Sequence, residues 1–174
     1  VHFLNNTSVQ NITDAAVQNM ISQMNADYSN QNPGLSTVRS AVQSLETNTQ
    51  IQFCLAQQDP NGQPTTGIEH VHTTKTCFDA NTETDNMKST TTNGANAWDV
   101  YHYLNIWVVS ICCSSPQTGG IAGYSYIPAS GNGLVGNSTD GIVVDYSIGV
   151  GNNNPTWSHE AGHYLGLHHT WGDL

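Results

Sequence analysis

The chain has 174 residues, a length that suits one domain and can bury a hydrophobic core. It carries 13 acidic side chains but only 3 basic ones (Arg39, Lys75 and Lys88), so its formal net charge is −10. Three cations cannot neutralise a phosphate track, and no apolar run approaches the roughly 20 residues of a membrane span, so neither nucleic acid nor a membrane is expected as a partner.

The chain starts at Val1 with no initiator methionine and no signal-peptide pattern. We therefore expect that an upstream segment has been removed, as in a secreted protein. The small share of charged residues, 9%, fits the same interpretation. The extracellular space is the predicted location.

The first predicted helix follows Thr13, which can cap it, with Asp14 in a first turn where the helix dipole favours an anion. Apolar side chains then recur at spacings of three and four and form one stripe: Val17, Met20, Ile21, Met24 and Tyr28. The methionines are expected to pack in the core. Asn32-Pro33-Gly34 ends the pattern.

Residues 50–57 alternate between apolar and polar and predict a strand, followed by a turn at 59–62 and a second strand over 67–73. The polar stretch 81–94 predicts a loop, and 95–103 a short helix. Residues 104–111 are almost continuously apolar, which is typical of a central strand covered on both faces. Two more strands are predicted over 121–127 and 141–147. Strands alternating with helices indicate a mixed α/β fold around one twisted sheet.

Four cysteines, Cys54, Cys77, Cys112 and Cys113, match no zinc-finger spacing. Disulfide bonds are the more plausible use in an exported protein. Four cysteines allow three complete pairings, and the sequence leaves the choice open.

The segment from Pro155 onward contains the candidate metal-binding and catalytic residues. Asn154 is a good N-cap and Pro155 a good first helical residue. On such a helix His159 and His163 lie one turn apart and about 40° apart around the axis, so their imidazoles can meet one metal ion. Glu160 lies close enough for its carboxylate to approach a water bound to that ion.

A third ligand requires the helix to stop. Gly166 can do so, because glycine enters the left-handed conformation without steric cost. Three residues later stands His169, which completes the pattern His-Glu-x-x-His-x-x-Gly-x-x-His. Three neutral imidazoles leave a fourth tetrahedral position for water, as a catalytic zinc requires, and Glu160 can act as general base.

The pattern resembles the metzincin zinc metalloproteases. Further segments narrow the resemblance to the pappalysin family and its bacterial cytophagalysin-like branch: IQFCLAQQDPNGQPTTGIEHVHT, WDVYHYLNIWV, GYSYIP, DGIVVDYS and HEAGHYLGLHHTWGD. The resemblance implies a secreted endopeptidase that binds one Zn²⁺ through His159, His163 and His169, with Glu160 as base. It also implies a twisted, mostly parallel sheet with an antiparallel edge strand, a backing helix and the zinc-binding helix.

Members of this family bind an extended protein or peptide substrate antiparallel to the edge strand above the metal. The matching stretch is 123–127, so Gly123, Tyr124 and Ser125 are the expected substrate-binding residues. Metzincins also carry a Met-containing turn well downstream of the third histidine, whereas all three methionines here lie upstream. We therefore expect residues 1–174 to be the N-terminal, upper subdomain. The C-terminal half, with any Ca²⁺ sites, would be missing or held as a separate fragment that acts as a partner.

Several alternatives remain. The chain could be a non-catalytic, zinc-stabilised extracellular fragment or binding module. His168 could replace His169 as ligand, although the glycine spacing favours His169. His70 and His72 share one strand face but are expected to be surface residues. Packing is expected for Trp157 and Trp171, and Asp173 could hydrogen-bond a zinc-bound imidazole.

Overall fold

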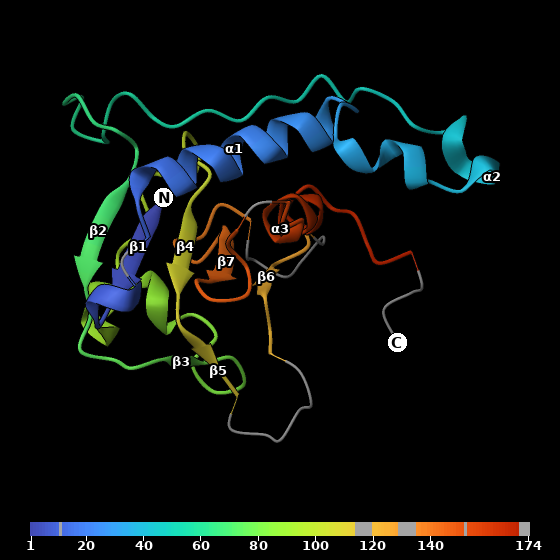
Figure 1. The fold of residues 1–174 in the computed structure, drawn as a ribbon. Coiled ribbons are helices and arrows are strands. Elements are labelled where there is room, and N and C mark those ends of the chain that lie inside the picture. The colour runs from blue at the N-terminus through green and yellow to red at the C-terminus, as the bar shows by residue number, and fades with distance from the viewer. Residues whose placement is uncertain (11, 114–119, 129–134, 152, 171–174) are drawn as a thin grey trace.

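A computed structural model describes residues 1–10, 12–113, 120–128, 135–151 and 153–170, and its centre is a mixed sheet (Figure 1). The sheet has five strands in the order β2-β1-β4-β7-β6. The first four run parallel, and the edge strand β6 pairs antiparallel with β7. The mixed α/β class and the antiparallel edge strand are therefore confirmed. The strands are β1 (His2–Asn5), β2 (Glu69–His72), β3 (Phe78–Asp79), β4 (Ile106–Val109), β5 (Ile111–Cys112), β6 (Gly123–Ser125) and β7 (Ile142–Asp145).

Two helices of at least two turns cover one face of the sheet, α1 (Asp14–Tyr28) and α3 (Thr156–Tyr164). Figure 1 shows α1 lying across the strands with α3 beside the β7–β6 end. The short helices are η1 (Ser8–Gln10), η2 (Pro33–Thr37), α2 (Ser40–Gln43), η3 (Asn86–Lys88) and η4 (Thr90–Thr92). Among the described residues, no helix combines the length and apolar character that a membrane crossing requires.

The core lies on both faces of the sheet because successive strand residues point to opposite sides. On the helical face, Met20 and Met24 of α1 and Trp157 of α3 pack against strand residues such as Val108 and Val144. On the other face, the segment from β3 to Ala95 covers the strands. Buried residues of this second cluster are Leu4, Phe78, Met87, Ala95, Trp107, Val109 and Val143. Core packing of the methionines and of Trp157 is thus confirmed.

Several predicted elements are found close to their predicted bounds. Thr13 caps α1, and its hydroxyl oxygen accepts the Ala16 N–H at 3.3 Å. All four residues of β4 are buried, as expected of a central strand. The helix that carries the histidines begins at Thr156, one residue later than predicted. Asn154 nevertheless serves it, because its side-chain oxygen accepts the Thr156 N–H at 2.9 Å.

The strand predicted over 50–57 is wrong. This segment pairs with no strand of the described chain; instead the Asn25 side chain binds the Phe53 backbone, with Asn25 Oδ1 at 2.7 Å from the amide nitrogen and Asn25 Nδ2 at 2.9 Å from the carbonyl oxygen. The Phe53 ring packs edge-on against Tyr28, with ring centroids 5.0 Å apart. Of the alternating apolar residues, Phe53 and Leu55 therefore pack against the core cluster that contains α1 residues, whereas Ile51 is exposed.

The helix predicted over 95–103 is also wrong. These residues form extended chain and a single turn in which the Tyr103 amide donates to the Asp99 carbonyl at 2.9 Å. Two contacts hold the extended part: Trp107 Nε1 donates to the Ala95 carbonyl at 2.9 Å, and Asn105 Nδ2 donates to the Trp98 carbonyl at 2.9 Å. Distant polar partners have replaced the hydrogen bonds of a helix. The predicted loop 81–94 contains only η3 and η4.

Candidate metal centre and active site

The three predicted ligands lie together at the end of α3. Gly166, with a φ of 95°, adopts the left-handed conformation just after the helix, and the chain returns to bring His169 beside the first two histidines. The Nε2 atom of His163 is 3.0 Å from that of His159 and 3.0 Å from that of His169, and the latter two are 3.2 Å apart. Within the described part of the chain, this is the one group of three or more histidine, cysteine or acidic side chains close enough to share a metal ion.

This arrangement fits a metal. Three nitrogens bound at about 2.0–2.1 Å to one tetrahedral zinc ion stand about 3.3 Å apart, close to the spacing found here. The Nδ1 atom of His163 lies 2.7 Å from the Leu167 carbonyl oxygen. Since a carbonyl only accepts, Nδ1 carries the proton, and the Nε2 lone pair is directed at the centre of the triangle.

Glu160 lies beside this triangle and is only 5% exposed. Its Oε2 atom is buried without a hydrogen-bond partner among the described residues. Burial raises the pKa of this carboxyl group to about 7, partly opposed by the nearby His163 ring. A buried carboxylate with a vacant oxygen at a histidine cluster is suited to exchanging a proton with a bound water molecule.

The expected substrate strand lines the same site. A cavity of about 310 Å³ is bounded by Gly123, Tyr124, Ser125 and Ile127 on one side and by the three histidines and Glu160 on the other. The Ser125 hydroxyl donates to the Glu160 backbone carbonyl at 2.8 Å and ties β6 to α3. The structure therefore brings all the predicted site residues together.

A second cavity, of about 430 Å³, lies on the other side of the histidines, between α3 and the end of α1. Here Asp27 accepts a hydrogen bond from the Ser158 hydroxyl, and Tyr28 donates to the Ser158 carbonyl at 3.2 Å. These contacts hold α3, which carries two of the candidate ligands, against α1, and sequence reasoning missed them. Asp27 and Tyr28 belong to the last turn of a predicted helix, where no local pattern indicates a partner more than a hundred residues away.

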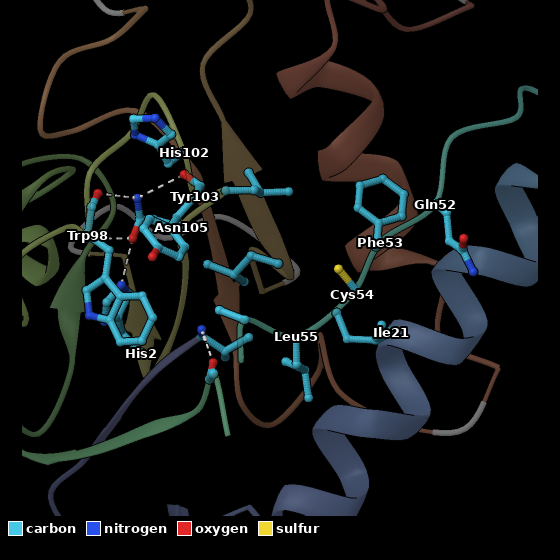
Figure 2. Close-up of a pocket in the computed structure, with 15 residues that line it drawn as sticks. His2, Ile21, Gln52, Phe53, Cys54, Leu55, Trp98, His102, Tyr103 and Asn105 are labelled. Carbon is cyan, nitrogen blue, oxygen red and sulfur yellow. Dashed lines mark hydrogen bonds between the residues drawn. The ribbon is translucent and has the colours of Figure 1, made fainter. Parts of the chain in front are cut away.

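Another cavity of about 310 Å³ lies away from the histidine triangle, among α1, residues 52–56 and the amino ends of β1 and β4 (Figure 2). Its central polar groups bind one another: His2 Nε2 is 2.8 Å from Asn105 Oδ1, which also accepts the Trp98 amide at 2.8 Å. Because these groups are satisfied, the geometry offers no chemistry comparable to the histidine site.

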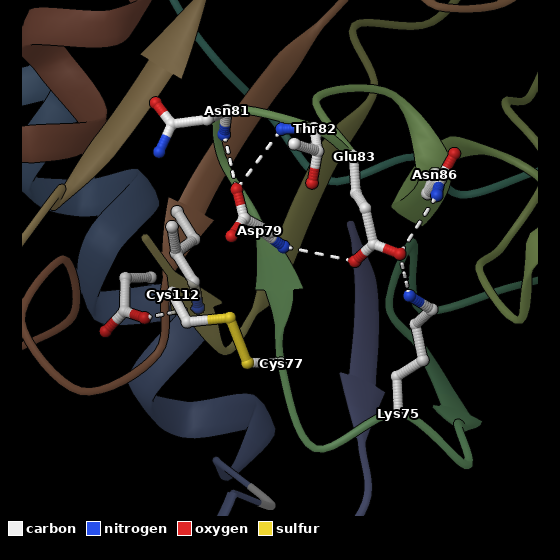
Figure 3. The surroundings of a disulfide bond; sticks show 10 residues. Lys75, Cys77, Asp79, Asn81, Thr82, Glu83, Asn86 and Cys112 are labelled. Carbon is white, nitrogen blue, oxygen red and sulfur yellow. Dashed lines mark hydrogen bonds and ion pairs between the residues drawn. A yellow bond between two sulfur atoms is a disulfide. The ribbon is translucent and has the colours of Figure 1, made fainter. Parts of the chain in front are cut away.

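The other histidines and the cysteines singled out in the sequence lie outside the histidine triangle. His70 pairs with Asp14 at 2.8 Å, and His72 and His168 are exposed. Cys77 and Cys112 form a disulfide (Figure 3). Cys54 and Cys113 are free thiols, so none of the three complete pairings occurs. Trp171 and Asp173 lie outside the described residues.

Comparisons with known proteins agree with this geometry. The family described as "Metallo-peptidase family M12B Reprolysin-like" matches residues 14–170. Mature mirolysin of Tannerella forsythia, solved in complex with a cleaved peptide, is 35% identical with a TM-score of 0.86 over 99% of this chain and 63% of its own. Mirolysin in complex with "compound 9" is also 35% identical, with a TM-score of 0.85 over 99% of this chain and 63% of its own.

A promirolysin mutant of the same organism is 34% identical, with a TM-score of 0.83 over 98% of this chain and 55% of that one. The chain thus spans less than two thirds of the length of each of these structures. A comparison with curated proteins found no match.

Proposed function

Because the chain belongs to the reprolysin-like metallopeptidases of family M12B, we propose that it is the metal-binding part of a secreted zinc metalloendopeptidase that hydrolyses internal peptide bonds. The observation that carries the proposal is the triangle of three Nε2 atoms beside a buried, unpartnered carboxylate oxygen. The likeness to mirolysin supports placing the chain among the metzincins, in the pappalysin family. We propose its cytophagalysin-like branch on the sequence segments alone. We also assign residues 1–174 to the upper subdomain of the enzyme.

His159, His163 and His169 would hold the zinc ion through their Nε2 atoms. When bound, zinc would lower the pKa of a water molecule and polarise the carbonyl group of the scissile peptide bond. The Leu167 carbonyl keeps the His163 proton on Nδ1, 2.7 Å away, and so keeps Nε2 available as a ligand.

Glu160 would act as the general base. Its buried Oε2 atom is free to accept a proton from the attacking water, and the same carboxyl group would then deliver that proton to the leaving amine. Both transfers need a carboxylate oxygen that is not already engaged, and Oε2 has no hydrogen-bond partner among the described residues.

Strand β6 would hold the substrate. As the edge of the sheet it pairs with β7 on one side, and no other described strand covers its second side. An extended peptide can therefore add to that edge through backbone hydrogen bonds. Gly123, Tyr124 and Ser125 line the cavity that contains the histidines, so such a peptide would pass beside Glu160.

The test compares variants of the full-length protein for zinc content and for hydrolysis of casein. Replacing Glu160 by Ala should lower the rate by at least about a hundredfold while bound zinc stays at one ion per chain. His169→Ala should lose the zinc, whereas the neighbouring His168→Ala, a matched control, should keep both zinc and activity. 1,10-Phenanthroline should abolish wild-type hydrolysis.

Casein hydrolysis that survives in the Glu160→Ala variant would reject the assigned mechanism. If the wild-type protein binds zinc firmly but cleaves nothing, the zinc-stabilised, non-catalytic module becomes the better description.

A further inference from the structure

Strand β6 is too short for its backbone hydrogen bonds alone to hold it in place. It has three residues and pairs with one neighbour, β7, through Gly123–Val144, Tyr124–Val143 and Ser125–Ile142. A strand with so few ladder bonds is marginal without packing on its faces. The described contacts of its side chains therefore decide where its free edge lies.

Two tyrosines, Tyr124 within β6 and Tyr126 just after its end, bind the same short segment before η3. The Tyr124 hydroxyl donates to the Thr84 carbonyl at 2.8 Å. The Tyr126 hydroxyl donates to Asp85 Oδ2 at 2.9 Å. Since Ser125 points the other way and binds the Glu160 carbonyl, alternate residues of one strand are fastened to opposite layers.

Lys88 joins this arrangement as a buried cation. Its side chain is 1% exposed, and its Nζ atom lies 2.9 Å from Asp85 Oδ1 and 2.7 Å from the Thr139 carbonyl oxygen. The ammonium group also lies 4.6 Å from the centroid of the Tyr126 ring. We call Asp85, Lys88, Tyr126 and Thr139 the Lys88 cluster.

The electrostatics of Lys88 indicate that the cluster fixes the arrangement of its members more than it stabilises the fold. Burial lowers the pKa of the Lys88 amine, and the ion pair with Asp85 opposes that shift. Lys88 is buried whereas the Asp85 side chain is 38% exposed, so desolvation of the cation and screening of the carboxylate both limit what this pair adds to stability. The buried Lys88 ammonium group instead restricts the conformation around it, because leaving it without its partners would be costly.

We propose that Lys88 is a positioning residue that, through Asp85 and Tyr126, holds the free edge of β6 in register for an extended peptide. That the edge binds a peptide substrate is taken from the proposed function, on which this inference rests. The cluster joins three separate parts of the chain: η3, the end of β6 and the turn that precedes β7. Losing the central cation would leave the Asp85 carboxylate and the Thr139 carbonyl without this partner and would loosen β6 relative to β7.

The chain contains a matched control. Lys75 also has a carboxylate partner, Glu83 (Figure 3). Its ammonium group lies 5.4 Å from the centroid of the Phe78 ring, and the contacts found for it lie in its own segment and not on β6. Lys75→Met and Lys88→Met therefore remove the same groups from neighbouring parts of the fold. Tyr126→Phe is a milder variant that keeps the ring under Lys88 and removes only the bond to Asp85.

The first measurement is amide hydrogen exchange of the full-length protein without substrate. Lys88→Met should accelerate exchange in residues 120–128 by about tenfold or more, while α1 keeps its wild-type protection. Tyr126→Phe should do the same to a smaller extent, and Lys75→Met should leave residues 120–128 within about twofold of wild type. If Lys88→Met does not fold, Tyr126→Phe decides the question. Equal effects of the two lysine variants, or an unchanged β6 in Tyr126→Phe, would overturn the proposal.

The second measurement is steady-state hydrolysis of a long peptide and of a truncated peptide that extends only a residue or two beyond the scissile bond. Backbone bonds to the edge strand form in both the bound substrate and the transition state, so their loss acts mainly on KM. Lys88→Met should raise KM for the long peptide several-fold with kcat changed less, and should affect the truncated peptide little. A protein that cleaves neither peptide contradicts the proposed function, whereas the exchange result still tests the positioning role.

Discussion

At Gly123 the backbone of β6 comes closer to its neighbours than any side chain would allow. A Cβ atom at this position would lie 2.8 Å from the Val143 carbonyl oxygen and 3.0 Å from both Glu160 Cγ and Thr156 Cγ2. The backbone oxygen cannot move aside easily, and the Glu160 side chain is the proposed base. The absence of a side chain at this one residue therefore sets the distance between β6 and α3.

Gly123→Ala should accordingly separate β6 from α3. We expect the free energy of unfolding to fall by about 1–3 kcal/mol, as for other overpacked sites. Proteolysis should fall by at least about tenfold, because the base and the substrate edge are displaced together. Denaturant titration and peptide hydrolysis measure the two effects.

Gly162→Ala is the control, since a Cβ atom there meets nothing closer than 3.6 Å and lies inside α3. Alanine should stabilise that helix by up to about 1 kcal/mol. The interpretation of Gly123 fails if both alanine variants behave alike.

Among the elements, the small sheet of β3 and β5 depends most on a covalent bond. It has two strands that pair through Phe78–Ile111 and Asp79–Cys112. The disulfide Cys77–Cys112 joins them, and the adjacent turn is held by Asp79 and Glu83 (Figure 3). This small sheet begins the segment that covers the second face of the main sheet and carries the Lys88 cluster.

Replacing both Cys77 and Cys112 by alanine should destabilise the protein by about 3–4 kcal/mol, the loop-entropy value for the observed sequence separation of 35 residues. Urea unfolding of the oxidised protein checks this value. Cys54→Ala, which removes an exposed free thiol, should stay within about 0.5 kcal/mol of wild type. A double variant as stable as Cys54→Ala would show that packing alone holds this sheet.

On the scale of the whole molecule, a polar network joins the amino ends of three strands. His2 of β1 lies between Glu69 of β2, with Nδ1–Oε2 at 2.6 Å, and Asn105 before β4, with Nε2–Oδ1 at 2.8 Å. Figure 2 shows the His2–Asn105 contact. The hydrogen bond to His2 holds the pKa of the Glu69 carboxyl below its usual range, and burial opposes this only in part. In a chain with 13 acidic and 3 basic groups, histidine serves here as the carboxylate's partner.

This network should make stability depend on pH. Since the pKa of Glu69 is lower in the folded than in the unfolded protein, its contribution is present above the unfolded value of about 4.5 and is lost as the pH falls through the folded value. Unfolding titrations from pH 7 to 3 should therefore show wild type more stable than Glu69→Gln above pH 5, with the difference shrinking at lower pH. A difference that stays constant across this range would exclude Glu69 as its source.

Local sequence was enough to predict those parts of the protein that depend on helical or strand periodicity. His159 and His163 meet because one helical turn separates them, and Gly166 lets His169 return for a steric reason contained in the residue itself. The buried run around β4 and the cap at Thr13 are likewise properties of neighbouring residues. The candidate metal site was therefore predictable, ligand by ligand.

The errors arose where a segment's partners lie far away in the chain. Residues 50–57 have the alternation of a strand, but Asn25 binds the Phe53 backbone, so no strand forms. Residues 95–103 were predicted as a helix, but bonds from the Trp107 and Asn105 side chains keep the segment extended. A local pattern indicates which conformations are possible, whereas distant hydrogen-bond partners select among them.

Local spacing was sufficient to predict the candidate ligand set and the proposed base, because the helical period and one glycine bring these side chains together within an eleven-residue segment. Only the tertiary structure decided which cysteines pair, that Lys88 is buried against Tyr126, and that β6 approaches Glu160 as closely as a glycine permits. Each of these contacts joins residues more than thirty positions apart. Their distances follow from how layers pack, which no local spacing contains.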